Sequence, residues 1–208
     1  MNTPSFQDGF KLYAENKFKE SLSIILPFAE EGNPKAQFVI GEAYLVGNGV
    51  SPDISIALLW FERSSAQDFA EAHYFLGLIY DPSLESNNIK NSTKDNNLSN
   101  SYYKKAFDLF MRDADKGDEK AMRWLGLCYQ CAKGVPHDQE KMIYWFNQAF
   151  KNGCTFAAND LFSYYSNENS TAFDQKEALK YYKSLKESNE KVVHNDTYEN
   201  LLSSDPGA

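Results

Sequence analysis

The 208-residue sequence lacks long hydrophobic runs, a surplus of positive charge and an even number of cysteines, and each absence excludes a class of protein. Its apolar stretches, such as residues 24–26 and 39–40, fall far short of the roughly 18 residues that a membrane-spanning helix needs. Residues 1–14 show no basic stretch followed by an apolar one, so we expect no secretory signal and a cytoplasmic location. Three cysteines argue against a disulfide framework and are typical of a reducing compartment.

The charge balance is acidic, with 21 Lys and Arg against 29 Asp and Glu and a formal net charge of −8. Binding to a nucleic-acid backbone draws on clustered Lys and Arg. The sequence has no such cluster, so we expect no nucleic-acid partner. An acidic balance is typical of a soluble protein, and a basic protein surface is its more natural partner.

Catalytic motifs are also missing. A Gly-x-Gly pair at residues 47–49 precedes a helical segment instead of following a strand, so it predicts a turn and not a phosphate site. Cys128 and Cys131 have the spacing of two zinc ligands, but a structural zinc needs four, and only His137 and Cys154 could join them. The histidines stand apart along the chain. We therefore expect no enzyme, no metal and no cofactor.

The chain repeats itself at a spacing of 36 residues, which indicates a repeat protein. Each unit starts at an alanine, followed by a large apolar residue four positions later and a tyrosine eight positions later. The alanines are Ala36, Ala72, Ala121 and Ala157, the apolar residues are Ile40, Leu76, Leu125 and Leu161, and the tyrosines are Tyr44, Tyr80, Tyr129 and Tyr165. These offsets lie on one helical stripe, and three units add a glycine at the fifth position that lets a second helix approach closely. Phe162 replaces this glycine in the fourth unit, which we expect to pack more loosely.

A second amphipathic helix is predicted in each unit, marked fifteen positions before the next alanine. The markers are Ser21, Ala57, Ala106, Met142 and Ala178, and the large residues three positions later are Ile24, Trp60, Leu109, Trp145 and Tyr181. The loops at residues 47–53 and 133–138 contain glycine turns and end in an aspartate that can cap the next helix. We expect Trp60 and Trp145 to lie in the core.

These residues resemble the Sel-one-like repeat (SLR) family, a relative of the tetratricopeptide repeat. The family pattern looks like Ala-x-x-x-Leu-Gly-x-x-Tyr, then Gly-x-Gly-Val-x-x-Asp, then Ala-x-x-Trp. The first unit follows it with Ala36, Ile40, Gly41, Tyr44, Gly47, Gly49, Val50, Asp53, Ala57 and Trp60. The resemblance covers about residues 5–187 and implies an all-α, right-handed α-solenoid of stacked helix-turn-helix hairpins. Ala132 and Met142 depart from the pattern.

The expected domain is a single solenoid of about five hairpins over residues 1–188. Tyr80 and Ala106 lie 26 residues apart where the corresponding pairs lie 13 apart, so the second unit contains an insert. Its Asn- and Ser-rich composition predicts disorder over about residues 84–100, and a surface loop is favoured over a binding loop. Residues 189–208 are expected to form a capping segment and a tail.

The resemblance to the tetratricopeptide family implies which residues bind a partner. In that family, the groove side chains lie one position before the alanine that starts each unit, and two and six positions after it. Carried over, these positions are Lys35, Phe38, Glu42, Glu71, Tyr74, Leu78, Lys120, Arg123 and Leu127, with Phe156, Asn159 and Ser163 in the last unit. Phe38, Tyr74 and Arg123 form one column, and aromatic residues and arginine are typical of binding hot spots. For Phe38 and Tyr74, burial between adjacent first helices is an equal alternative.

The resemblance implies a non-catalytic module that binds a protein or peptide through the concave face of the solenoid, as an adaptor or an inhibitor. Bacterial SLR proteins include immunity proteins that neutralise toxins, and a small acidic chain is similar to those, so a basic toxin is one candidate partner. A β-lactam-binding branch is disfavoured because alanines stand at its cysteine positions. A homodimer through the end of the solenoid stays open.

Overall fold

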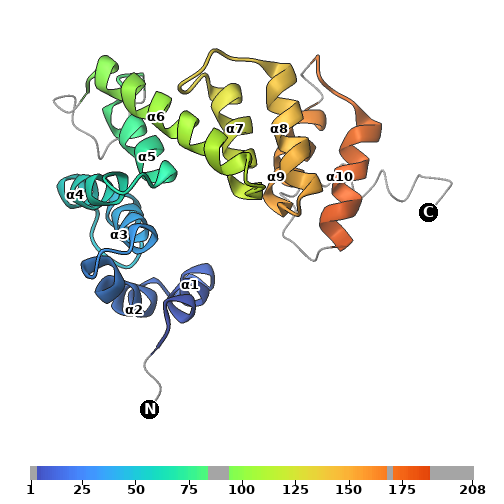
Figure 1. The fold of residues 1–208 in the computed structure, drawn as a ribbon. Helices are drawn as coiled ribbons and strands as arrows, with labels where there is room; N and C mark the ends of the chain where they lie inside the picture. Colours follow the sequence, from blue (N-terminus) through green and yellow to red (C-terminus); the bar gives the residue numbers. More distant parts are fainter. Residues whose placement is uncertain (1–3, 84–93, 168–170, 188–208) are drawn as a thin grey trace. The chain divides into compact units, whose positions relative to one another are not determined.

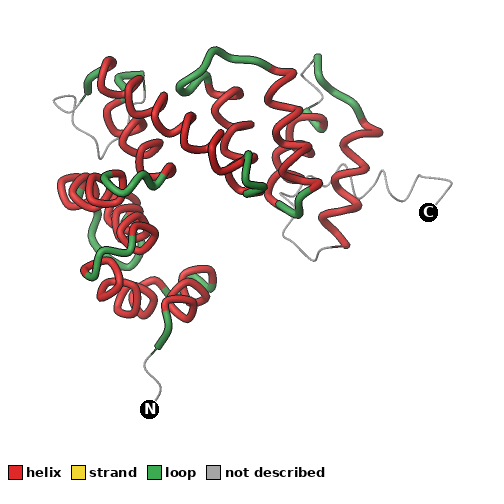
Figure 2. Tube along the Cα trace, viewed as in Figure 1, coloured by secondary structure: helices red, strands yellow, loops and turns green. Residues whose placement is uncertain are grey.

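The structure of the chain, a computed structural model, describes residues 4–83, 94–167 and 171–187, and these contain ten α-helices and no β-strand (Figures 1 and 2). The helices are α1 (Phe6–Ala14), α2 (Phe18–Glu30), α3 (Pro34–Val46), α4 (Ile54–Ser65), α5 (Ala70–Tyr80), α6 (Asn96–Ala114), α7 (Glu119–Cys131), α8 (Gln139–Lys151), α9 (Thr155–Tyr165) and α10 (Gln175–Glu187). Consecutive helices form hairpins, from α1–α2 to α9–α10. The described residues therefore have the predicted pattern of two helices per repeat.

The chain divides into two compact units. The first takes in residues 1–109 and 133–135, which include α1 to α5 and most of α6. The second takes in residues 110–132 and 136–208, which include the end of α6 and α7 to α10. The single solenoid over residues 1–188 stays a prediction.

Aspartate side chains begin several helices, as the loop pattern predicted. The Asp53 carboxylate accepts a hydrogen bond from the Ile56 amide at 3.1 Å, and the Asp138 carboxylate accepts one from the Lys141 amide at 2.9 Å. Asp118 caps α7 in the same way. Amides in the first turn of a helix have no partner within the helix, so a side-chain acceptor there stabilises the start.

The glycine at the fifth position brings a ring of the second helix against the first helix. A Cβ atom on Gly41 would lie 2.8 Å from the Phe61 ring, and the same close approach occurs at Gly77. In the fourth repeat Phe162 is itself buried, and its ring centroid lies 5.7 Å from that of Tyr182. The expectation of looser packing there needs correction, because Phe162 is itself part of the buried cluster of α8, α9 and α10 and packs against the second helix with its own ring.

Helix α6 begins at Asn96, inside the segment 84–100 for which disorder was predicted. The Asp95 carboxylate accepts hydrogen bonds from the amides of residues 97 and 98, at 2.9 and 3.0 Å. The Ser99 hydroxyl donates to the Gly77 carbonyl at 2.9 Å. Residues 96–100 are therefore the polar, mostly exposed first turn of an amphipathic helix. Residues 84–93, and the predicted capping segment at 189–208, lie outside the described residues.

The two tryptophans differ in burial. Trp60 is buried in a cluster with α2 and α3 residues, including Leu22, Ile25 and Val39. Trp145 is only half-buried. Its prediction as a core residue needs correction, because the cluster formed by α8, α9 and α10 uses Met142 and Phe146 from α8 as its buried residues.

Candidate functional site

The two aromatic residues of the predicted binding column lie in the core of the first unit. Phe38 is half-buried, with ring centroids 5.1 to 5.7 Å from those of Phe61, Phe69 and Phe75. Tyr74 exposes 7% of its surface and lies 5.5 Å from the Tyr103 ring. Both side chains pack against rings of neighbouring helices, Phe38 while half-buried and Tyr74 while buried against α6, and their role in partner binding stays a prediction.

Lys35 and Glu42 lie on the part of α3 that meets α1. The Lys35 ammonium is 4.4 Å from the centroid of the Phe10 ring, and the Tyr13 hydroxyl donates to the Glu42 carboxylate at 3.4 Å. The Tyr13 oxygen also accepts from the Asn48 amide at 3.0 Å. Burial raises the pKa of Glu42, and it raises the pKa of Tyr13 to about 12. These contacts hold the first hairpin to the second.

The remaining predicted residues are spread over both units. Glu71 and Leu78 are half-buried on α5. Lys120 is exposed on α7, and Leu127 packs against the cluster formed by α8, α9 and α10. Leu127 therefore contributes mainly to the core, whereas Lys120 is free to contact solvent or a partner.

On the first helices of the second unit, Arg123 of α7 contacts two residues of α9, Asp160 and Phe156. Its Nε and Nη2 atoms donate to the two carboxylate oxygens of Asp160, at 2.5 and 3.1 Å, so the ion pair is bidentate. Its guanidinium carbon lies 5.6 Å from the centroid of the Phe156 ring. Arg123 exposes 28% of its side chain, while Phe156 exposes 58% of its surface. We call Arg123, Phe156 and Asp160 the α7–α9 surface.

The α7–α9 surface was predicted only in part. The carried-over groove positions include Arg123 and Phe156 but omit Asp160. The repeat spacing could have predicted the contact with Asp160. Asp160 follows Arg123 by 37 residues, which is one more than the repeat length. Equivalent positions on neighbouring first helices lie side by side in a repeat protein, so a pair offset by about one repeat is within reach of an ion pair.

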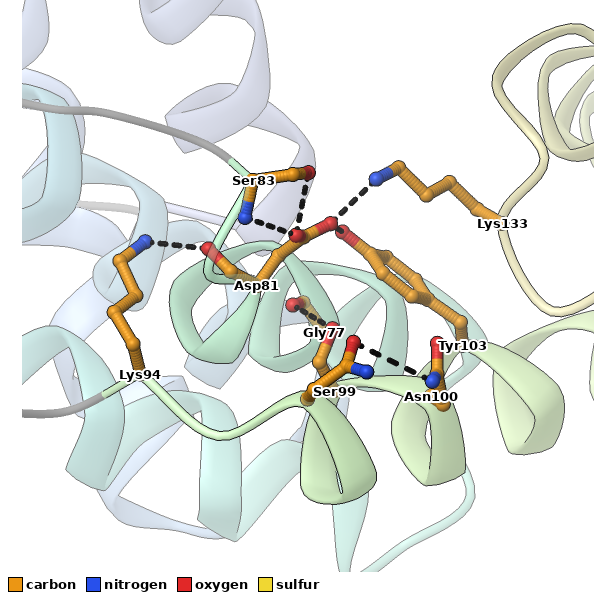
Figure 3. Close-up of polar contacts among 9 residues, drawn as sticks. Gly77, Asp81, Ser83, Lys94, Ser99, Asn100, Tyr103 and Lys133 are labelled. Atoms are coloured by element: carbon orange, nitrogen blue, oxygen red, sulfur yellow. Dashed lines mark hydrogen bonds and ion pairs between the residues drawn. The ribbon is translucent and has the colours of Figure 1, made fainter.

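A second polar cluster surrounds Asp81 at the end of α5 (Figure 3). The Asp81 carboxylate accepts hydrogen bonds from the Ser83 amide at 2.8 Å, the Ser83 hydroxyl at 2.6 Å and the Tyr103 hydroxyl at 3.0 Å. It also forms an ion pair with Lys133, and the Lys94 ammonium donates to its backbone carbonyl at 2.7 Å. Asp81 thus joins α5, α6 and the loop of the third repeat.

The electrostatics of this cluster indicate that Asp81 has a structural role and stays ionised. Burial alone would raise the pKa of Asp81, but the hydrogen bonds from Lys133, Ser83 and Tyr103 outweigh it and lower the pKa to about 2. Burial, together with the nearby Asp81 carboxylate, raises the pKa of the Tyr103 phenol. A carboxylate held ionised by this many donors is a poor proton acceptor at neutral pH.

The described residues show little other reactive chemistry. They contain no group of three or more His, Cys, Asp or Glu side chains arranged to hold a metal ion. Cys128 is buried, which raises its pKa to about 12, and burial also raises the pKa of Cys154. Within the same residues, no helix is both long enough and apolar enough to cross a membrane.

Comparison with protein families identifies the class of protein. The Sel1 repeat matches residues 34–69, 70–109, 119–154 and 156–189. These four segments cover more than half of the chain and coincide with the hairpins from α3–α4 to α9–α10. The protein is therefore an α-solenoid built from helical repeats, and it belongs to the Sel1 repeat family. The predicted family and fold class are confirmed. Sel1 repeats are generally protein-interaction modules.

The chain is also similar to individual proteins and solved structures. The chain is 37% identical over 71 residues to an uncharacterised protein of Neisseria meningitidis serogroup B, and it spans about 15% of that curated relative's length. It is similar to the crystal structure of a Sel1 repeat protein from Oxalobacter formigenes, with 25% identity and a TM-score of 0.51 over 90% of this chain and 69% of the other. An immunity protein from Pseudomonas aeruginosa overlays with 15% identity and a TM-score of 0.42, over 88% of this chain and 86% of the other.

Proposed function

We propose that this chain is a non-catalytic protein-binding module that holds its partner at the α7–α9 surface. The observation that carries the proposal is the exposure of Phe156, 58% of whose surface faces solvent, beside a positioned arginine. An exposed aromatic ring next to an arginine has the composition of a binding hot spot. Burying such a ring against a partner contributes roughly 1.5 to 3 kcal/mol.

The ion pair supports the proposal because it pre-organises the surface. Asp160 holds the Arg123 guanidinium with two parallel hydrogen bonds, so the arginine loses little conformational freedom when a partner arrives. Two guanidinium nitrogens bind Asp160, and the fork geometry of arginine offers further N–H donors. The surface therefore combines an apolar anchor with directed donors.

Two uses of such a module remain distinct. An adaptor brings a partner to another protein, whereas an inhibitor such as an immunity protein neutralises a toxin by occupying it. The net charge of −8 favours the second use for a basic toxin, since opposite charges accelerate association. Co-expression with a basic candidate toxin would separate the two: failure to rescue growth would exclude the immunity role for that toxin.

The α7–α9 surface is tested with Phe156→Ala. The matched control is Phe173→Ala, because Phe173 is also an exposed phenylalanine, at 41%, but precedes α10. We expect affinity purification from the source cells to recover a stoichiometric protein with the parent and with Phe173→Ala. We expect Phe156→Ala to bind that protein at least about 10-fold more weakly by calorimetry, which corresponds to 1.4 kcal/mol. Equal binding by Phe156→Ala would exclude this surface as the binding site.

A further inference from the structure

Helix α2 carries a cavity, and one of its lining residues is Ile24, the large apolar position of the repeat pattern in this helix. The cavity has a volume of about 460 Å³ and is lined by Pro4, Ser23, Ile24, Pro27, Phe28 and Glu31. All its lining residues come from α2 and the segments that flank α1 and α2. We call it the α2 pocket. Its size falls within the range of roughly 300–1,000 Å³ that is typical of ligand sites.

The apolar wall of the α2 pocket is held in place by aromatic packing. The Phe28 ring lies 5.4 Å from that of Phe6, and Phe6 lies 4.7 Å from Phe10. Pro27 is exposed within the helix and Leu26 beside it exposes 38% of its surface. A large apolar side chain inserted here would meet a preformed surface, which lowers the entropic cost of binding.

Pro27 also changes the polarity of the pocket. In a regular helix, the amide of residue 27 would donate to the carbonyl of Ser23, four positions earlier. Proline has no amide hydrogen, so the Ser23 carbonyl lacks its usual helical donor. Both Ser23 and Pro27 line the pocket. A backbone acceptor without its usual helical donor therefore belongs to a residue of the pocket wall.

The charge around the pocket is negative. Helix α2 and its C-terminal cap present exposed Glu20, Glu30 and Glu31, against Lys19 in the first turn. Residues one helical turn apart share a face, so Glu20 neighbours Ile24, and Glu31 neighbours Pro27. Residues 1–83 as a whole contain eleven Asp and Glu against five Lys and Arg. The apolar pocket is thus bracketed by carboxylates.

We propose that the α2 pocket binds a basic segment of a partner protein, which inserts one large apolar side chain flanked by Lys or Arg. The carboxylates would attract the basic residues, and the Ser23 carbonyl would accept a hydrogen bond from the segment. The proposal is independent of the α7–α9 surface. With both surfaces occupied, the chain would join two different partners.

Charge complementarity favours this occupant over two others. Residues 188–208 contain four acidic residues and one basic residue, so this segment would be repelled by the glutamates. A second copy of the chain joined through the same face would bring two sets of Glu20, Glu30 and Glu31 together, which is unfavourable.

The proposal is tested with a phage-displayed library of random 12-residue peptides, selected on the full chain. We expect the selected peptides to contain a Leu, Phe, Trp or Met flanked by Lys or Arg. Ser23→Arg should weaken their binding at least about 10-fold, because it fills the pocket and adds a positive charge. Ser55→Arg, a change of the same kind at an exposed position of α4, should bind like the parent.

A second pair of variants isolates the charge. Glu31→Gln should weaken binding of the selected peptides about 2- to 5-fold, as expected for an exposed charge pair, and Glu62→Gln on α4 should have no effect. The proposal is overturned if no peptide is selected, if the selected peptides lack basic residues, or if Ser23→Arg and Ser55→Arg bind alike. A dimer in light scattering that Ser23→Arg abolishes would assign the pocket to a second copy instead.

Discussion

At the residue scale, His73 on α5 is a buried titratable group close to the Ser65 backbone and to the charges of Lys105 and Asp68. It exposes 9% of its surface, and neither ring nitrogen has a hydrogen-bond partner among the described residues. Its ring centroid lies 6.0 Å from that of Tyr102. Burial lowers the pKa of His73 below its ordinary value of 6.5, the charge of Lys105 adds to this effect, and Asp68 opposes it.

The stability of the protein should therefore depend on His73 below neutral pH. The unfolded chain binds a proton at this histidine as the pH falls through about 6.5, whereas the folded chain binds it only at lower pH. The contribution of the neutral imidazole to stability is complete above about pH 6.5 and is lost as the pH falls below that value. We expect the free energy of unfolding, measured by urea denaturation, to decrease between pH 7.0 and pH 5.5. This decrease should be smaller for His73→Met than for the parent.

The substitution is chosen from the chain itself, because Met122 occupies the equivalent buried position in the third repeat. His137→Gln is the control, since it removes an imidazole from an exposed position. An identical fall in stability for His73→Met and the parent would show that His73 titrates alike in both states.

At the scale of elements, the loop after α7 is tied to the preceding repeat. Residues 133–135 belong to the first compact unit, although α7 belongs to the second. A Cβ atom on Gly134 would lie 2.5 Å from the Tyr103 carbonyl oxygen, so glycine is required for this close approach. Lys133 forms its ion pair with the buried Asp81. Residues 133 and 134 therefore contact the second repeat within the first unit, through both backbone and charge.

Removal of the Lys133 charge should destabilise the protein strongly. In Lys133→Met the Asp81 carboxylate stays buried without its cation, and loss of one member of a buried ion pair costs about 3 kcal/mol. Lys141→Met removes a similar ion pair, with Asp138, that is exposed, and should cost less than about 1 kcal/mol. Urea denaturation measures both. Equal effects would show that the Asp81 cluster has no special role in stability.

At the scale of the whole molecule, the apolar core consists of several clusters and not of one. Trp60 lies in a cluster with α2 and α3 residues, while α8, α9 and α10 form another cluster that includes Met142 and Phe146. In repeat proteins each unit contacts mainly its neighbours, so a local change in stability need not reach the far end.

Truncation of Trp60 should therefore act regionally. Trp60→Ala should lower the free energy of unfolding of the region around its cluster by roughly 3 to 5 kcal/mol, because it leaves a cavity in a buried site. We expect hydrogen exchange measured by mass spectrometry to show faster exchange in α2, α3 and α4, with α9 and α10 close to the parent. A uniform loss of protection along the chain would indicate that the molecule unfolds as one cooperative unit.

The sequence by itself determined the repeat, the family and the alternation of helices, because these depend on short-range periodicity and on caps such as Asp53 and Asp138. Only the tertiary structure decided which predicted groove residues are exposed. Tyr74 and Phe156 occupy comparable first-helix faces, yet one is buried and the other exposed, since burial depends on which side chains the neighbouring helices bring against each ring. The pairing of Arg123 with Asp160 was decided in the same way, because it joins residues of two different helices.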